Sequence, residues 1–269
     1  MNATTNNTIF VSIAAWFDWE KKTEIFLKSA DKHEIEILLL DKGRSWKGFY
    51  YHKILQLAIT FQLFHDQRQQ IKYVVYTDAR DVVFIKPLKE ILSQINTLDE
   101  NKVWFNADKP QCWPLQSHWF TNEIKQRFGQ DGIVNSGCYV GRIENVISLL
   151  RDCVQLHSRL VEQKPDKGTI EALLINEMKA SYLQDDQYHI QALQALGSSK
   201  IAIDKDRQVF ACFDGGFPLL KTAPEKGSNG TMPLGTAGIL HSPWMLMRSN
   251  RNPENLIRWR HWAMTEEII

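Results

Sequence analysis

The sequence predicts an α/β protein in which helices flank a mostly parallel central sheet. Three observations support this prediction. Residues 9–40 have the pattern of a strand, a helix and a strand, and such a βαβ unit implies parallel strands with a right-handed crossover. The apolar, β-branched run at residues 73–77 is typical of a strand buried on both faces. Strand-like and helical segments alternate along the 269 residues, a length that suits one large domain.

The first half of the chain provides a regular series of elements. Residues 9–15 are apolar enough for a buried strand, and residues 19–30 have the spacing of an amphipathic helix. Residues 37–40 form the second strand, and a loop rich in glycine and cations follows. The later elements are a helix over residues 49–65, strands at 73–77, 82–85 and 102–107, and a helix that begins at Pro87.

The second half continues the alternation. We expect a tight turn at residues 134–137 that runs into a strand ending at residue 141. The other expected elements are helices over residues 146–161, 169–178 and 254–265, a helix opened by residues 185–187, a strand pair at 201–203 and 209–213, and a strand before His241. No internal repeat and no interdomain linker is recognisable, so we expect a single domain over residues 1–269.

Composition narrows the classes of function. The net charge is +1, so no basic field favours nucleic acid. None of the four cysteines forms a Cys-x-x-Cys motif with another, which argues against a zinc site of the usual spacing. Their wide spacing indicates that the thiols are reduced. The first apolar run, residues 9–17, is too short to span a membrane, and no basic region precedes it. We therefore expect a cytoplasmic protein without a membrane span, compatible with a homodimer.

Two carboxylates follow the predicted strand at residues 73–77. Asp78 and Asp81 are three positions apart, and the ligands of open α/β sheets bind beyond the carboxyl ends of such strands. A carboxylate pair can hold Mg²⁺ or Mn²⁺, and the cation then neutralises a diphosphate. The same spacing fits a solvated turn with ion pairs through Arg80, and the motif alone leaves both interpretations open.

A late histidine and a second acidic pair are further candidates. His241 ends an apolar strand, where a neutral imidazole would favour Mn²⁺ over Mg²⁺ in an oxygen-rich site. A purely structural histidine is the alternative. Asp185 and Asp186 are adjacent at the start of a helix, which suits either helix capping or an acid/base or sugar-binding role.

Three more features suggest ligand contacts. Lys53 follows Gly48 in the first turns of a helix, an arrangement that cradles phosphate but is also common on protein surfaces. Asn135-Ser136-Gly137 is either a simple turn or a source of donors to sugar hydroxyls. Trp113 lies in a predicted loop, where an indole can stack on a sugar or pack into a core.

The order of these motifs resembles one family. A βαβ start, Asp-x-x-Asp, Cys-Trp-Pro, Asn-Ser-Gly, Asp-Asp-Gln and a late histidine together resemble the glycosyltransferase domains of the procollagen lysyl hydroxylases and the related collagen galactosyltransferases. The resemblance covers the chain from about Ile9 to about Arg248. It implies a GT-A fold, which is a Rossmann-like fold of nucleotide-diphospho-sugar transferases, and the use of a UDP-sugar with Mn²⁺.

The resemblance also implies roles for individual residues. Asp78 and Asp81 match the carboxylates that hold Mn²⁺ and the diphosphate, and His241 matches the third metal ligand. Asp185 and Asp186 match an acidic helix start beside the reacting sugar carbon. The remaining matches are Trp46 and Lys53 on the nucleotide side, Trp113 over the sugar site, and Asn135 and Gly137 in the donor-sugar turn.

Among the departures from the family pattern that concern the donor, two involve the nucleotide and the phosphates. Arg80 precedes the second metal aspartate, where the family usually has an aromatic residue, although arginine can also stack on a base. After His241, Ser242-Pro243-Trp244 replaces the family's Gly-Asn-Gly and removes flexible phosphate donors. Arg248 is the candidate cation that replaces them.

We therefore expect a GT-A-like enzyme that transfers a hexose, glucose or galactose, from UDP to a hydroxyl of a glycan, peptide or small molecule. Lys53 and Arg248 would add charge stabilisation at the leaving group. The alternative is a non-catalytic domain that binds nucleotide sugars or carbohydrate on the same fold. A nucleotidyltransferase is disfavoured, because residues 14–18 lack the glycine-rich, lysine-containing loop that it needs.

Overall fold

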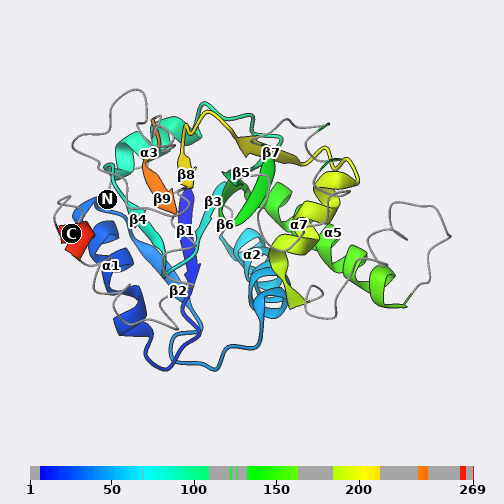
Figure 1. The fold of residues 1–269 in the computed structure, drawn as a ribbon, viewed down its shortest axis with the longest axis horizontal. Helices are drawn as coiled ribbons and strands as arrows, with labels where there is room; N and C mark the ends of the chain where they lie inside the picture. Colours follow the sequence, from blue (N-terminus) through cyan, green and yellow to red (C-terminus); the bar gives the residue numbers. More distant parts are fainter. Residues whose placement is uncertain are drawn as a thin grey trace. The chain divides into compact units, whose positions relative to one another are not determined.

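A computed structural model gives the fold of the protein (Figure 1). It describes residues 7–68, 70–108, 122, 126, 132–162, 184–212, 236–241, 261–264 and 269. The chain divides into two compact units. The first comprises Met1–Thr8, Trp46–Val74 and Asp99–Ile203, and the second comprises Ile9–Ser45, Val75–Leu98 and Asp204–Ile269. Each unit is therefore assembled from segments that are distant in the sequence.

The described strands form two sheets, and the central one is mostly parallel, as the sequence predicts. The six-stranded sheet has the order β2-β1-β3-β6-β5-β7, and the three-stranded sheet has the order β4-β9-β8. The strands are β1 (Thr8–Ile13), β2 (Ile37–Leu40), β3 (Tyr73–Thr77), β4 (Val82–Phe84), β5 (Val103–Asp108), β6 (Ile133–Arg142), β7 (Ile201–Asp204), β8 (Phe210–Cys212) and β9 (Ile239–His241). β1 and β2 pair in parallel, which confirms the predicted βαβ unit.

Aromatic packing organises the second unit. Its helix α1 (Trp19–Lys32) packs against β4. Phe84 of β4 lies with its ring centroid 6.0 Å from that of Phe10 and 5.6 Å from that of Phe26, so one ring joins a strand and a helix. The predicted helix after Pro87 is α3 (Leu88–Ile95). A neighbouring apolar cluster includes Val83, Ala211, Leu240 and Trp262.

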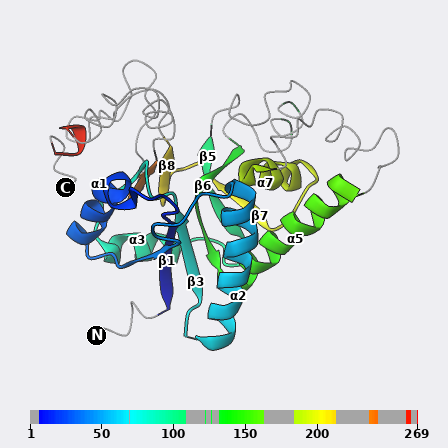
Figure 2. The same ribbon diagram turned by 90° about the horizontal axis from the view of Figure 1, so that it is seen from below.

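Helices make up much of the described first unit. The helix predicted over residues 49–65 consists of a π-helix, η1 (Tyr50–Gln56), followed by α2 (Leu57–Gln67). A hydrophobic pattern does not distinguish a π-helical turn from an α-helical one, and π-turns are frequent at functional sites. The long helix α5 (Ile143–Glu162) packs against both α2 and α7 (Asp186–Ala195), as Figure 2 shows.

The predicted turn at residues 134–137 is wrong. These residues lie inside β6, which pairs antiparallel with β5. The pairing is irregular there: Phe105 of β5 lies opposite Tyr139, whereas the next residue, Asn106, lies opposite Asn135. β6 therefore bulges by several residues without leaving the sheet, and a bulge uses the same small polar residues as a turn.

The predicted pairing of residues 201–203 with 209–213 is also wrong. The first segment is β7 in the larger sheet, whereas β8 pairs in parallel with β9 in the smaller one. The cause is Asp204, whose carboxylate accepts the backbone N–H groups of Gln208, Val209 and Phe210, each at 2.8 Å. This side chain satisfies donors that a hairpin would have bonded across its strands.

Several predictions concern residues that the structure does not describe. The helix predicted over residues 169–178 lies outside the described residues, and of the helix predicted over 254–265 only residues 261–264 are described, as helix. Among the described helices, none combines the length and the apolar character needed to cross a membrane.

Candidate functional site

The proposed metal ligands lie together in the second unit. β3 ends at Thr77, so Asp78 is the first residue beyond the strand, and Asp81 immediately precedes β4. β9 pairs antiparallel with β4, and this pairing puts His241 opposite Val82. β9, a strand from late in the sequence, thereby brings the imidazole of His241 beside the carboxylate of Asp81.

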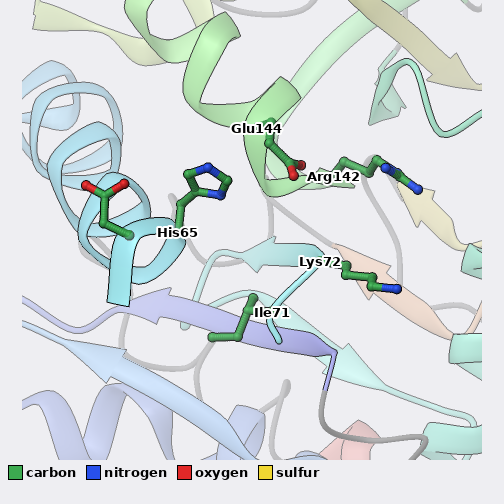
Figure 3. Close-up of a pocket in the computed structure, with 6 residues that line it drawn as sticks. His65, Ile71, Lys72, Arg142 and Glu144 are labelled. Atoms are coloured by element: carbon green, nitrogen blue, oxygen red, sulfur yellow. The ribbon is translucent and has the colours of Figure 1, made fainter. Parts of the chain in front are cut away.

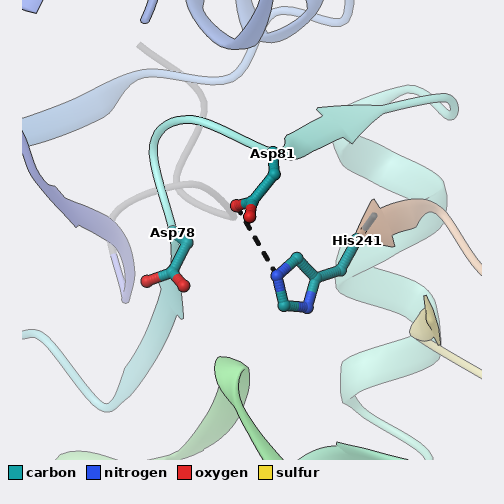
Figure 4. A group of neighbouring side chains, drawn as sticks. All are labelled: Asp78, Asp81 and His241. Carbon is teal, nitrogen blue, oxygen red and sulfur yellow. Dashed lines mark ion pairs between the residues drawn. The ribbon is translucent and has the colours of Figure 1, made fainter. Parts of the chain in front are cut away.

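The three side chains converge on one point (Figure 4). One ligand atom from each of Asp78, Asp81 and His241 lies within 4.8 Å of the other two. His241 Nε2 is 3.6 Å from Asp81 Oδ1, and the two side chains are only 2% and 13% exposed. The hydroxyl of Tyr76 donates to Asp78 Oδ1 at 2.9 Å and orients that carboxylate.

This group of side chains fits a divalent cation. Two ligand atoms that are each about 2.1 Å from one ion lie at most about 4.2 Å apart. The ligand atoms of the three side chains lie within 4.8 Å of one another, so each separation would have to shorten by less than about 1 Å to bind an ion. Two carboxylates supply hard oxygen ligands, and one imidazole shifts the preference toward Mn²⁺. Asp78, Asp81 and His241 are therefore able to hold such an ion.

A buried ion pair lies in the first unit. Gly48 has φ = +111°, a conformation that favours glycine, and it leads into the π-helix η1. In η1, Lys53 is buried with its Nζ 3.5 Å from Asp186 Oδ2, and the two side chains are only 7% and 5% exposed. The ammonium also lies 5.5 Å from the centre of the Phe49 ring. The alternative interpretation of Lys53 as an ordinary surface lysine is therefore wrong.

The two adjacent aspartates of α7 have different surroundings. Asp185 is the N-cap, and its carboxylate accepts the backbone N–H of Tyr188 at 3.1 Å. Asp186 is the first helical residue, and its carboxylate faces Lys53. The capping role that the sequence left open thus belongs to Asp185, while Asp186 carries the charge that is paired with a cation.

The Asn-Ser-Gly motif shapes the bulge of β6. Asn135 Oδ1 accepts the N–H of Gly137 at 2.8 Å, which closes a local loop. Gln187 of α7 reaches the same place, where its Oε1 accepts the N–H of Ser136 at 3.1 Å. The bulge and the start of α7 are therefore fixed to each other by side-chain hydrogen bonds.

Sequence reasoning missed Gln191, Gln194 and His189 of α7. Gln191 donates to the carbonyl of Val134 at 3.0 Å, and Gln194 accepts the N–H of Val134 at 3.3 Å. Burial lowers the pKa of His189 to about 4, and burial also raises the pKa of Tyr50 to about 12. No local sequence signal marks them, and only the structure shows that eight consecutive residues, Tyr188 to Ala195, are all buried.

The remaining predicted residues have mixed outcomes. Trp46 stacks on His52 with ring centroids 4.7 Å apart and an interplanar angle of 22°. His52 Nε2 accepts the N–H of Lys47 at 3.0 Å, which ties the loop to η1. Trp113 and Arg248 lie outside the described residues, so their predicted roles stay predictions.

A cavity of about 500 Å³ lies elsewhere in the first unit (Figure 3). Its lining mixes acidic and basic groups, so no single ligand charge is selected. None of the residues predicted from the sequence lines it. The lining residues are His65, Asp66, Ile71, Lys72, Arg142 and Glu144.

The α/β fold and the Asp-Asp-His group define a protein able to hold a divalent cation beyond a strand end, and comparison with known proteins gives the family. A family model described as the PLOD GT domain matches residues 6–160, more than half of the chain. The chain therefore belongs to this family of GT-A-like glycosyltransferase domains. The matched range contains Asp78 and Asp81 but ends before Asp186 and His241.

A procollagen-lysine,2-oxoglutarate 5-dioxygenase of Drosophila melanogaster is one similar protein. The two chains are 28% identical over 139 residues, which is 48% of this chain and 18% of the relative. The chain therefore matches only about a fifth of the length of that protein. The match does not carry the dioxygenase activity in the relative's name to this chain.

Proposed function

We propose that this chain is an Mn²⁺-dependent glycosyltransferase that moves a hexose, glucose or galactose, from a UDP-sugar to an acceptor hydroxyl. One observation carries the proposal: the ligand atoms of Asp78, Asp81 and His241 converge within 4.8 Å in a chain of the PLOD GT domain family. The acceptor class is a hydroxyl-bearing glycan, peptide or small molecule. Procollagen lysine appears in the name of the Drosophila relative, so a hydroxylysine peptide is one acceptor to test.

The metal ligands have separable tasks in this proposal. Bound Mn²⁺ would act as a Lewis acid toward the departing UDP. Asp81 and His241 lie at adjoining strand ends and would fix the ion in place. Asp78 is held by the Tyr76 hydroxyl, so its carboxylate keeps one orientation toward the ion and the diphosphate.

Asp186 rather than Asp185 is our candidate for the carboxylate that orients the sugar or takes the acceptor proton. Asp185 already uses its carboxylate to cap α7. Asp186 is paired with Lys53, whose ammonium offsets the cost of keeping a carboxylate ionised in a buried place. Lys53 would also stabilise negative charge on the leaving group.

The other predicted residues complete the donor side. Asn135 and Gly137 shape the bulge that would present backbone groups to the donor sugar, and Trp46 would cover the nucleotide. We retain Trp113 as the indole over the sugar and Arg248 as an added cation for the diphosphate. The assignments of these five residues extend the family pattern and remain parts of the proposal.

Calorimetry with UDP and a UDP-release assay test the proposal together. Wild-type protein should bind UDP when Mn²⁺ is present and should release UDP from UDP-glucose or UDP-galactose. Asp81→Ala should lose both properties, whereas Asp66→Ala, a carboxylate of the separate cavity, should lose neither. Absence of Mn²⁺-dependent UDP binding in the wild type would refute the proposal.

A non-catalytic binding domain is the second candidate. In the family pattern, a Gly-Asn-Gly segment after the histidine supplies hydrogen-bond donors to the phosphates. Here Ser242-Pro243-Trp244 replaces that segment, which favours the non-catalytic candidate. This candidate predicts Mn²⁺-dependent UDP binding without UDP release from any UDP-sugar in the presence of acceptors.

A further inference from the structure

His189 is a fully buried histidine one turn into α7. Its Nδ1 lies 2.7 Å from the backbone carbonyl oxygen of Asp185. A carbonyl oxygen can only accept, so Nδ1 must carry a proton and donate it. The backbone of the N-cap residue therefore determines the tautomer of this imidazole.

A second histidine continues the chain of hydrogen bonds. Nε2 of His189 lies 3.0 Å from Nδ1 of His157 on α5, so exactly one proton can lie between these two nitrogens. Burial disfavours the cationic form of His189. His189 Nε2 is therefore the acceptor, and His157 donates through Nδ1–H.

Ring packing fixes both imidazoles. Tyr50 stacks on His157 with centroids 4.0 Å apart and planes at 18°, and its ring centroid is 4.8 Å from that of His189. Tyr50 belongs to η1, the same π-helix that carries Lys53. The element that supplies the cation for Asp186 thus also holds the histidine pair.

We propose that His157 and His189 are positioning residues that act on Asp186 through the N-cap of α7. The hydrogen bonds run from His157 to His189 and from His189 to the backbone carbonyl of Asp185. The next residue, Asp186, carries the carboxylate that is paired with Lys53. Two apolar side chains would fill this place without burying polar atoms, so packing alone does not require the pair. The catalytic part of this inference rests on the proposed function.

Nitrogen NMR of the full chain with ¹⁵N-labelled histidine tests the hydrogen-bond direction. Both His157 and His189 should be neutral Nδ1–H tautomers at pH 7, the form less favoured by free histidine in water. Assignment follows from loss of a signal in His157→Phe. A cationic or Nε2–H His189 would overturn the proposal.

Two substitutions at one position separate the hydrogen bond from the packing. His157→Phe keeps a ring on Tyr50 but removes the donor, whereas His157→Gln keeps a donor. We expect kcat for UDP-sugar turnover to fall about tenfold in His157→Phe and to return to within about threefold in His157→Gln, because one buried hydrogen bond corresponds to roughly tenfold. The KM for the donor should be unchanged, and His65→Phe is the control.

Hydrogen exchange separates failure of this inference from failure of the proposed function. The N–H of Tyr188 reports the cap directly, because it donates to the Asp185 carboxylate. Its exchange should accelerate in His157→Phe and return toward the wild-type rate in His157→Gln, even if no UDP-sugar is turned over. The positioning role would be overturned if His157→Phe kept the wild-type exchange rate of the Tyr188 N–H, or if it kept the wild-type kcat in an active enzyme.

Discussion

Removal of the Lys53 ammonium should strongly destabilise the fold. In Lys53→Met the aliphatic chain remains but Asp186, whose side chain is 5% exposed, loses its cation. Coulomb's law for unit charges 3.5 Å apart gives about 5 kcal/mol at an effective dielectric constant of 20. Breaking one partner of a buried pair costs about 3–5 kcal/mol in proteins, so both routes give the same magnitude.

Urea denaturation followed by circular dichroism measures this cost as a change in the free energy of unfolding. The double variant Lys53→Met, Asp186→Leu should recover most of the loss, because no unpaired charge is then buried. Lys22→Met is the matched control, since Lys22 pairs with an exposed Asp18 and such pairs contribute about 1 kcal/mol or less. A loss below about 1 kcal/mol in Lys53→Met, or no recovery in the double variant, would refute the described pairing.

Three further predictions concern stability. His189 has a pKa of about 4 in the folded state and 6.5 in the unfolded state, so the unfolded chain binds more protons between these pH values. The free energy of unfolding should therefore fall by up to about 3 kcal/mol as the pH drops from 6.5 to 4. In a series of urea melts at different pH, His189→Leu should flatten this part of the pH dependence. Gly48→Ala should cost about 1–3 kcal/mol through its φ of +111°, more than Gly43→Ala at φ = +73°, as thermal melts would show; equal costs would contradict the argument. Asp204→Ala should cost about 3 kcal/mol or more by leaving three backbone donors without their acceptor, and Asp204→Asn should cost less in the same urea assay.

Local patterns predict the start of the fold and two of the three proposed metal ligands, Asp78 and Asp81. The βαβ unit and the strand before Asp78 follow from short apolar runs, and the structure confirms both. His241 is different, because it reaches Asp81 only through the pairing of β9 with β4, which lies more than 150 positions earlier. The local pattern marks His241 only as a candidate ligand, and the family resemblance joins it to Asp78 and Asp81, because hydrophobic periodicity has no information about such distant pairing.

The errors have physical causes of the same kind. Asn135-Ser136-Gly137 has the composition of a turn, but Ser136 donates its backbone N–H to Oε1 of Gln187 on α7, and this contact helps to hold the segment as a bulge within β6. Residues 201–203 and 209–213 have the pattern of a strand pair, but the carboxylate of Asp204 between them accepts the backbone N–H groups that follow, and the two segments enter different sheets. In both places a long-range or side-chain hydrogen bond overrides the local preference, and a single sequence does not reveal such a partner.

The same limit explains why the histidine pair was missed. His157 and His189 are 32 positions apart on two helices, and neither has a local pattern that marks it. The adjacent aspartates were recognised from their type and position, yet only the structure distinguishes the cap Asp185 from Asp186, which faces Lys53.

The central claim is that Asp78, Asp81 and His241 hold Mn²⁺, and pulsed electron paramagnetic resonance of the Mn²⁺-loaded chain tests it most directly. We predict coupling to a single directly bound imidazole nitrogen, which disappears in His241→Gln and persists in His65→Gln. Mn²⁺ that binds without any nitrogen coupling, or a coupling that survives His241→Gln, would contradict the assignment.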